Sequence, residues 1–135
     1  MNFMAGQPKA EGINSAEEIL EEAREGRPFI LIDGHGPDNV GAVCIPAEYA
    51  TRQAVNFMAR YARGLICLTL TEDRCRELRL PLMTALNGTR TGTNFTLSIE
   101  AAEGVTTGIS AADRARTIQV AVGRDSRPSD LVQPG

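Results

Sequence analysis

Hydrophobic and polar positions in the first third of the chain predict a helix followed by two strands. Ser15 and Glu18 form a capping-box pattern ahead of a narrow apolar face, and Gly26 ends this helix. The apolar run at residues 28–33 predicts a buried strand. After a glycine-rich loop, residues 40–45 predict a second strand.

The pattern continues through the rest of the chain with helices and strands in turn. Thr51 can cap a helix with an apolar stripe, and residues 65–70 are apolar and β-prone, which predicts a central strand. Thr71 begins a short charged helix. Apolar and polar residues alternate over 95–100, the spacing of a half-buried strand, and residues 110–122 predict the last long helix.

This order of elements predicts an α/β (α+β) single domain over residues 14–135, with a mixed sheet flanked by helices. Residues 1–13 are polar and contain glycine and proline, so we expect a flexible N-terminal tail. Pro128 after Ser126 predicts a further helix start with proline at its first position. The positions predicted to fill the core are Ile30, Ile32, Leu65, Ile66, Leu68, Phe95, Leu97 and Ile99.

Composition excludes several classes of function. A net charge of −3 argues against nucleic acid or an anionic membrane as partner, because both reward clustered Lys and Arg. No run of about 18 apolar residues is present, and the N-terminus lacks a basic segment followed by an apolar one. The three cysteines, Cys44, Cys67 and Cys75, are odd in number and lack CxxC spacing, which suits a reducing cytoplasm.

Four blocks of sequence carry a resemblance to a known family. They are AEYAT at 47–51, RGLIC at 63–67, GTNFT at 92–96 and GVTTGISAADR at 104–114. Together they resemble the 3,4-dihydroxy-2-butanone 4-phosphate synthases of riboflavin biosynthesis, and the resemblance extends over roughly residues 15–135. It implies that family's α+β fold in a divergent, C-terminally short member, and a homodimer.

The resemblance also implies a reaction, in which ribulose 5-phosphate is converted to 3,4-dihydroxy-2-butanone 4-phosphate and formate with Mg²⁺ or Mn²⁺. The acidic loop of the family aligns without gaps with DGHGPDNVGA at 33–42. Pro37 then stands where the family has a substrate-binding Arg, and Asp38 where it has a metal-ligating Glu. Val40 and Ala42 occupy two further carboxylate positions, so the loop loses charge and oxygen ligands.

Two more family positions differ near the end of the sequence. Gln119 stands where the family usually has an Arg needed for activity, and Gln133 begins QPG where the family has Arg-Pro-Gly-His. These differences predict a degenerate, inactive member. The family resemblance implies Mg²⁺ or Mn²⁺ as cofactor, and the alternative is that this chain binds no cofactor. The candidate site residues are Asp38 and Cys67 for catalysis, Asp38 for metal, and Thr93, Thr106, Thr107 and Gly108 for substrate or phosphate.

Three hypotheses follow from these residues. The chain is a lyase of riboflavin synthesis, or a non-catalytic relative that binds a sugar phosphate weakly or pairs with an active partner. In the third, the loop at 34–44 carries a rebuilt site with His35, Asp38 and Cys44. The turn at 106–108 precedes a helix whose free amide groups can bind phosphate, but the same residues can also form an ordinary turn and cap. The joint replacement of Arg, Glu and Asp positions in the loop favours the second hypothesis.

Overall fold

The computed structural model describes residues 12–32, 41–88 and 92–135. The chain divides into two compact units, Met1–Pro46 and Ala47–Gly135, and each is described by itself. The predicted tail lies almost wholly outside the described residues. A single domain over 14–135 stays a prediction.

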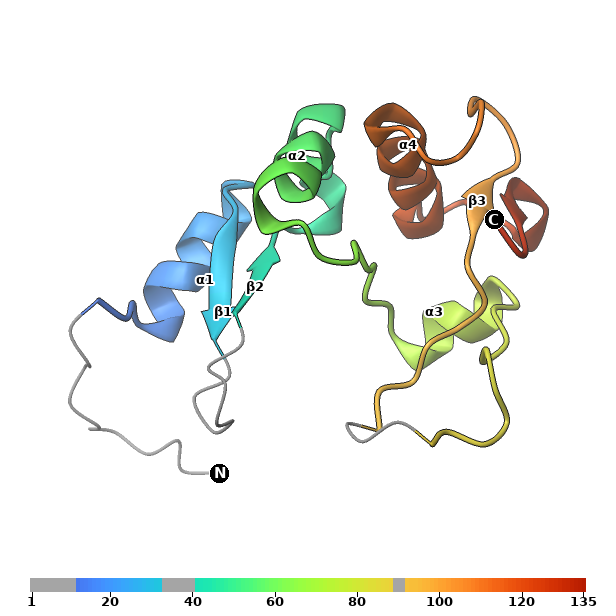
Figure 1. Ribbon diagram of the computed structural model, residues 1–135, viewed down its shortest axis with the longest axis horizontal. Helices are drawn as coiled ribbons and strands as arrows, with labels where there is room; N and C mark the ends of the chain where they lie inside the picture. Colours follow the sequence, from blue (N-terminus) through green and yellow to red (C-terminus); the bar gives the residue numbers. More distant parts are fainter. Residues whose placement is uncertain (1–11, 33–40, 89–91) are drawn as a thin grey trace. The chain divides into compact units, whose positions relative to one another are not determined.

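The first unit contains one helix and one β-hairpin (Figure 1). Helix α1 (Ala16–Arg24) begins with the predicted capping box, in which Ser15 Oγ accepts from the Glu18 amide at 3.3 Å. The Glu18 carboxylate in turn accepts from the Ser15 amide at 2.7 Å. Strands β1 (Phe29–Ile32) and β2 (Gly41–Cys44) lie where the two strands were predicted, and they pair antiparallel.

The core prediction is wrong for the strand residues of this unit. Ile30 is 60% exposed and Ile32 is 56% exposed. The hairpin has only two strands, and among the described residues no third strand extends its sheet. A two-stranded hairpin cannot bury both of its faces, so apolar character alone did not place these side chains in a core.

The second unit contains most of the regular structure. Its helices are short except for α4, and its two strands form one antiparallel pair, with Ala101 opposite Leu131. In chain order the elements are the 3-10 turn η1 (Ala47–Tyr49), α2 (Arg52–Phe57), the π-helical turn η2 (Met58–Ala62), α3 (Glu72–Glu77), β3 (Glu100–Ala101), α4 (Ala111–Val122), the 3-10 turn η3 (Pro128–Asp130) and β4 (Leu131–Val132).

The core of the second unit lies where the end of α3, α4 and β4 meet. Leu78 and Ala121 are fully buried there, and Leu80 and Leu131 are nearly so. Helix α4 packs against β3, which shortly precedes it, and against α2, which is distant in sequence (Figure 1).

The predicted central strand at 65–70 is wrong. These residues belong to no ladder, and no backbone hydrogen bond joins them to another part of the described chain. Leu65 is 82% exposed, whereas Leu68 packs against the core. The segment's side chains alternate between exposed and half-buried, as in a strand, but it has no partner strand. A strand needs hydrogen bonds to a partner as well as this alternation.

The predicted strand at 95–100 is formed only in part. Thr96 forms an isolated bridge with Leu82, and Phe95, predicted to be core, is 44% exposed. Regular strand structure begins only at β3. The α/β fold class is confirmed, and the strands of the described residues form two antiparallel pairs. None of the helices in the described ranges combines the length and apolar character that a bilayer crossing requires.

Candidate functional site

The most specific sequence block folds into a turn that leads directly into α4. Ser110 is the N-cap of this helix, with φ −65° and ψ 156°. Its Oγ accepts a hydrogen bond from the Asp113 amide at 3.0 Å. The cap satisfies one of the four amides that a helix start leaves without intrahelical partners, and it confirms the predicted helix start.

Asp113 joins this helix to the turn before it. Its side chain is almost fully buried, and Oδ2 accepts from the Thr106 hydroxyl at 2.9 Å and from the Thr107 amide at 3.3 Å. In a capping box, an acidic side chain at this helical position turns back to the amide of the cap residue. Asp113 instead reaches into the preceding turn and fixes two of the predicted site residues.

Burial and hydrogen bonding act on the pKa of Asp113 in opposite directions. Burial raises the pKa because it disfavours the charged carboxylate. Hydrogen bonds from Thr106, Ser110 and the Thr107 amide lower it, and they prevail, so the pKa lies below its ordinary value. Asp113 is therefore ionised at neutral pH and brings a negative charge to the base of the turn.

Gly108 allows the turn to pass close to a second carboxylate. Its φ is +75°, in the left-handed region that favours glycine. A Cβ at this position would lie 2.5 Å from Glu100 Oε2. The backbone conformation therefore favours glycine here, and a larger side chain would also have to displace the Glu100 carboxylate.

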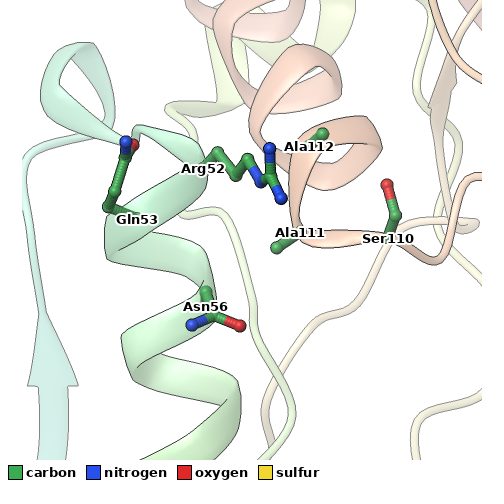
Figure 2. A pocket seen from close by; sticks show the side chains of 6 residues that line it. All are labelled: Arg52, Gln53, Asn56, Ser110, Ala111 and Ala112. Carbon is green, nitrogen blue, oxygen red and sulfur yellow. The ribbon is translucent and has the colours of Figure 1, made fainter.

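A pocket of about 560 Å³ opens beside the start of α4. It is lined by Arg52, Gln53 and Asn56 from α2, and by Ser110, Ala111 and Ala112 from the start of α4 (Figure 2). Figure 2 shows the Arg52 side chain reaching from α2 towards Ala111 and Ala112.

The electrostatics of this pocket favour an anion. The Arg52 guanidinium makes no hydrogen bond or ion pair with the described parts of the chain, and it faces the positive end of the α4 dipole. The amides at the first positions of a helix also have no intrahelical acceptor. An anionic group in the pocket would therefore be attracted both by the Arg52 guanidinium and by the N-terminal end of α4, which otherwise face each other.

Sequence analysis missed the α2 side of this pocket. Thr51 was predicted to cap a helix, and its Oγ1 does accept from the Ala54 amide at 3.2 Å. This places Arg52 and Asn56 within the first turns of α2. No local signal shows that these turns face α4, because that packing joins segments far apart in the sequence.

The Gln119 side chain connects α4 to the backbone before α2. Its Nε2 lies 2.9 Å from the Ala47 carbonyl oxygen, and 3.4 Å and 3.3 Å from those of Glu48 and Ala50. These donor contacts join α4 to η1, immediately before α2. The position that the family resemblance associates with an active-site Arg therefore holds an amide that points to backbone oxygens.

None of the predicted site residues that the structure describes lines the pocket. Cys67 is exposed, with Sγ 3.8 Å from the Leu65 carbonyl oxygen. Thr93 is exposed, and its carbonyl accepts from Asn87 Nδ2 at 2.9 Å. The structure thus brings Thr106, Thr107 and Gly108 together in one turn shortly before Ser110, which lines the pocket, while Cys67 and Thr93 lie in other segments of the chain.

The predicted metal ligands cannot be assembled from the described residues. Asp38 and His35 lie outside the ranges that the structure describes. Within those ranges, no group of three or more His, Cys, Asp or Glu side chains is placed to hold a metal ion. Cys44, the third member of the rebuilt-site hypothesis, is half-buried at the end of β2, with Sγ 3.6 Å from the Ala42 carbonyl oxygen.

Comparison with known proteins shows the family. The family model of 3,4-dihydroxy-2-butanone 4-phosphate synthase matches residues 17–135, and the chain belongs to this family. It is 54% identical over 119 residues to the 3,4-dihydroxy-2-butanone 4-phosphate synthase of Pseudomonas syringae pv. tomato. That match covers 88% of the chain and 32% of the relative, so the chain spans about a third of that relative's length.

Solved structures agree with this assignment. The two-domain synthase RibBX from A. baumannii is 54% identical, with a TM-score of 0.79 over 88% of this chain and 35% of its own. A synthase in complex with two magnesium ions is 33% identical, with a TM-score of 0.87 over 91% of this chain and 57% of its own. The resemblance, the fold class and the riboflavin-synthesis family predicted from the sequence are confirmed.

Proposed function

We propose that this chain is a non-catalytic member of the 3,4-dihydroxy-2-butanone 4-phosphate synthase family that retains a weak site for a sugar phosphate. The site lies at the N-terminal end of α4. The observation that carries the binding part of the proposal is the pocket in which Arg52 faces the first turn of that helix.

The loss of catalysis is supported by the residues at the family's acidic and basic positions. Ala42 pairs with Leu31 in the β1–β2 hairpin, and its methyl group offers no oxygen to a metal ion. Pro37 and Val40 are likewise unable to bind a phosphate or a cation through a side chain. The Gln119 amide is occupied by carbonyls of η1. Within the described residues, no set of side chains is placed to bind a metal ion.

Retained binding is supported by the chemistry at the start of α4. A phosphate carries negative charge and several acceptor oxygens, which match the Arg52 guanidinium and the amides of the first helical turn. The same end of the helix carries the turn with Thr106, Thr107 and Gly108, which can contact the rest of a sugar phosphate. Asp113 and Glu100 set a limit, because their carboxylates weaken the attraction for an anion.

The purified chain is expected to form no formate from ribulose 5-phosphate in the presence of Mg²⁺ or Mn²⁺. The reason is that several charged groups needed for enolisation and phosphate binding are replaced together, and each is typically worth about 10²-fold or more in rate. The measurement is formate release over hours, with the Pseudomonas syringae relative as the positive control. Metal-dependent turnover that is abolished by Asp38→Ala would show that the chain is a working lyase.

Ribulose 5-phosphate is expected to bind weakly and without metal, with a dissociation constant on the order of 1 mM. An NMR titration should shift the amide signals of residues 104–113, and Arg52→Ala should weaken binding roughly tenfold, because one charged hydrogen bond is lost. Arg60→Ala is the matched control, since Arg60 is an exposed arginine of the same unit that lies over the Tyr61 ring rather than in the pocket. Micromolar, metal-dependent binding that is lost in His35→Ala would favour a rebuilt site in the 34–44 loop instead.

A further inference from the structure

Asp113 has an unusual position for an acidic side chain in this protein. It is buried, and its Oδ2 accepts from Thr106 and Thr107, which lie in the turn before its own helix. Two other capping carboxylates, Glu18 in α1 and Asp130 in η3, instead accept from the amides of their own cap residues, Ser15 and Arg127. Asp113 therefore does more than cap α4.

The contacts of Asp113 divide the polar groups of the turn into two sets. The Thr106 hydroxyl and the Thr107 amide are occupied by the carboxylate. The Thr107 hydroxyl and the Gly108 amide have no hydrogen bond within the described parts of the chain. The Glu100 carboxylate lies close to Gly108.

We infer that Asp113 is a positioning residue, which holds the 106–108 turn so that the Thr107 hydroxyl and the Gly108 amide are the groups presented to a ligand. The Thr106 hydroxyl is then engaged within the chain, although Thr106 belongs to the same sequence motif as Thr107. The ligand class is the sugar phosphate of the proposed function, on which this inference rests. Asp113 itself touches no ligand.

Two variants of Asp113 in the full chain test this inference. Asp113→Ala removes both hydrogen bonds, so exchange of the Thr107 amide hydrogen should accelerate roughly tenfold or more, and the dissociation constant for ribulose 5-phosphate should rise roughly tenfold. Asp113→Asn keeps an acceptor oxygen at the same place. It should restore slow exchange and an affinity within about threefold of the unchanged chain.

Control variants separate positioning from a general loss of stability. Glu18→Ala removes a capping carboxylate in the other unit and should leave both the Thr107 exchange rate and the affinity unchanged. If Asp113→Ala does not fold, Thr106→Val removes one of the two bonds at nearly constant volume and should still accelerate exchange at Thr107. Thr107→Val should leave that exchange slow but weaken binding.

The outcomes distinguish this inference from the proposed function. Unchanged Thr107 exchange in Asp113→Ala would overturn the positioning role. So would affinity equal to that of the unchanged chain, or an Asp113→Asn variant as impaired as Asp113→Ala. Absence of any saturable shift in the unchanged chain would overturn the proposed function, while the exchange measurement would still decide whether Asp113 orders the turn.

Discussion

Replacing Leu78 by alanine is expected to lower the free energy of unfolding by about 2–5 kcal/mol. Leu78 follows α3 and is fully buried, and it forms the small core with Leu80, Ala121 and Leu131. Removing its isobutyl group eliminates apolar contacts and leaves a cavity that so small a core cannot readily refill. A domain of this size is typically stable by only about 5–15 kcal/mol, so the loss is a large fraction of the total.

The measurement is urea unfolding followed by circular dichroism, with Leu86→Ala as the matched control. Leu86 is 89% exposed, so the same change of residue there should alter the free energy of unfolding by less than about 0.5 kcal/mol. Equal effects of the two substitutions would mean that the core does not lie at Leu78. Because the same substitution is made at both positions, the comparison isolates the effect of burial.

Helix starts were the part of the fold that the sequence predicted best. Ser15 and Thr51 are caps as predicted, and the helices predicted to begin at Thr71 and Ser110 do so with these residues as caps. In each of the four, the side-chain oxygen accepts from an amide three residues later. Such bonds lie within one turn of the chain, so the residues that make them are adjacent in the sequence. Pro128 also occupies the predicted first position of a helical turn.

Strands were predicted less well because their partners are distant. Residues 65–70 and 95–100 were predicted as strands, but within them only Thr96 forms a bridge and only Glu100 lies in a strand. Hydrophobic alternation identifies a chain segment that can form a strand, whereas a ladder also needs a partner in register. Exposed Leu65 and Phe95 show that apolar character also does not determine burial.

In the candidate site, too, residues adjacent in the sequence were predicted and residues from distant segments were not. Thr106, Thr107 and Gly108 belong to one motif and do lie together before α4, as their adjacency requires. Arg52 comes from a helix far away in the sequence, and only the packing of α2 against α4 brings it to the pocket. The role of Asp113 was missed for a different reason. Its helical position predicts a local cap, and its actual partners lie in the preceding turn.

Arg74→Ala is expected to lower the free energy of unfolding by about 1.5–3 kcal/mol, the value typical of hydrogen bonds to a charged group. The Arg74 side chain is only 18% exposed. From α3 it donates through Nε to the Ala121 carbonyl at 3.2 Å, and through Nη2 to the Gly123 carbonyl. These carbonyls end α4, where a positive charge also interacts favourably with the helix dipole.

Arg76 on the same helix provides the matched control for Arg74. Its side chain is 66% exposed, and its partners are the exposed carboxylates of Glu72 and Asp73. Exposed ion pairs contribute little, so Arg76→Ala should change the free energy of unfolding by less than about 1 kcal/mol. Arg74→Lys should fall between the two, because lysine keeps the charge but cannot donate to both carbonyls with the guanidinium's planar geometry. Chemical unfolding of the three variants in one buffer measures this order. If Arg76→Ala lowered the free energy of unfolding as much as Arg74→Ala, the two carbonyl contacts would not be what holds α3 to the end of α4.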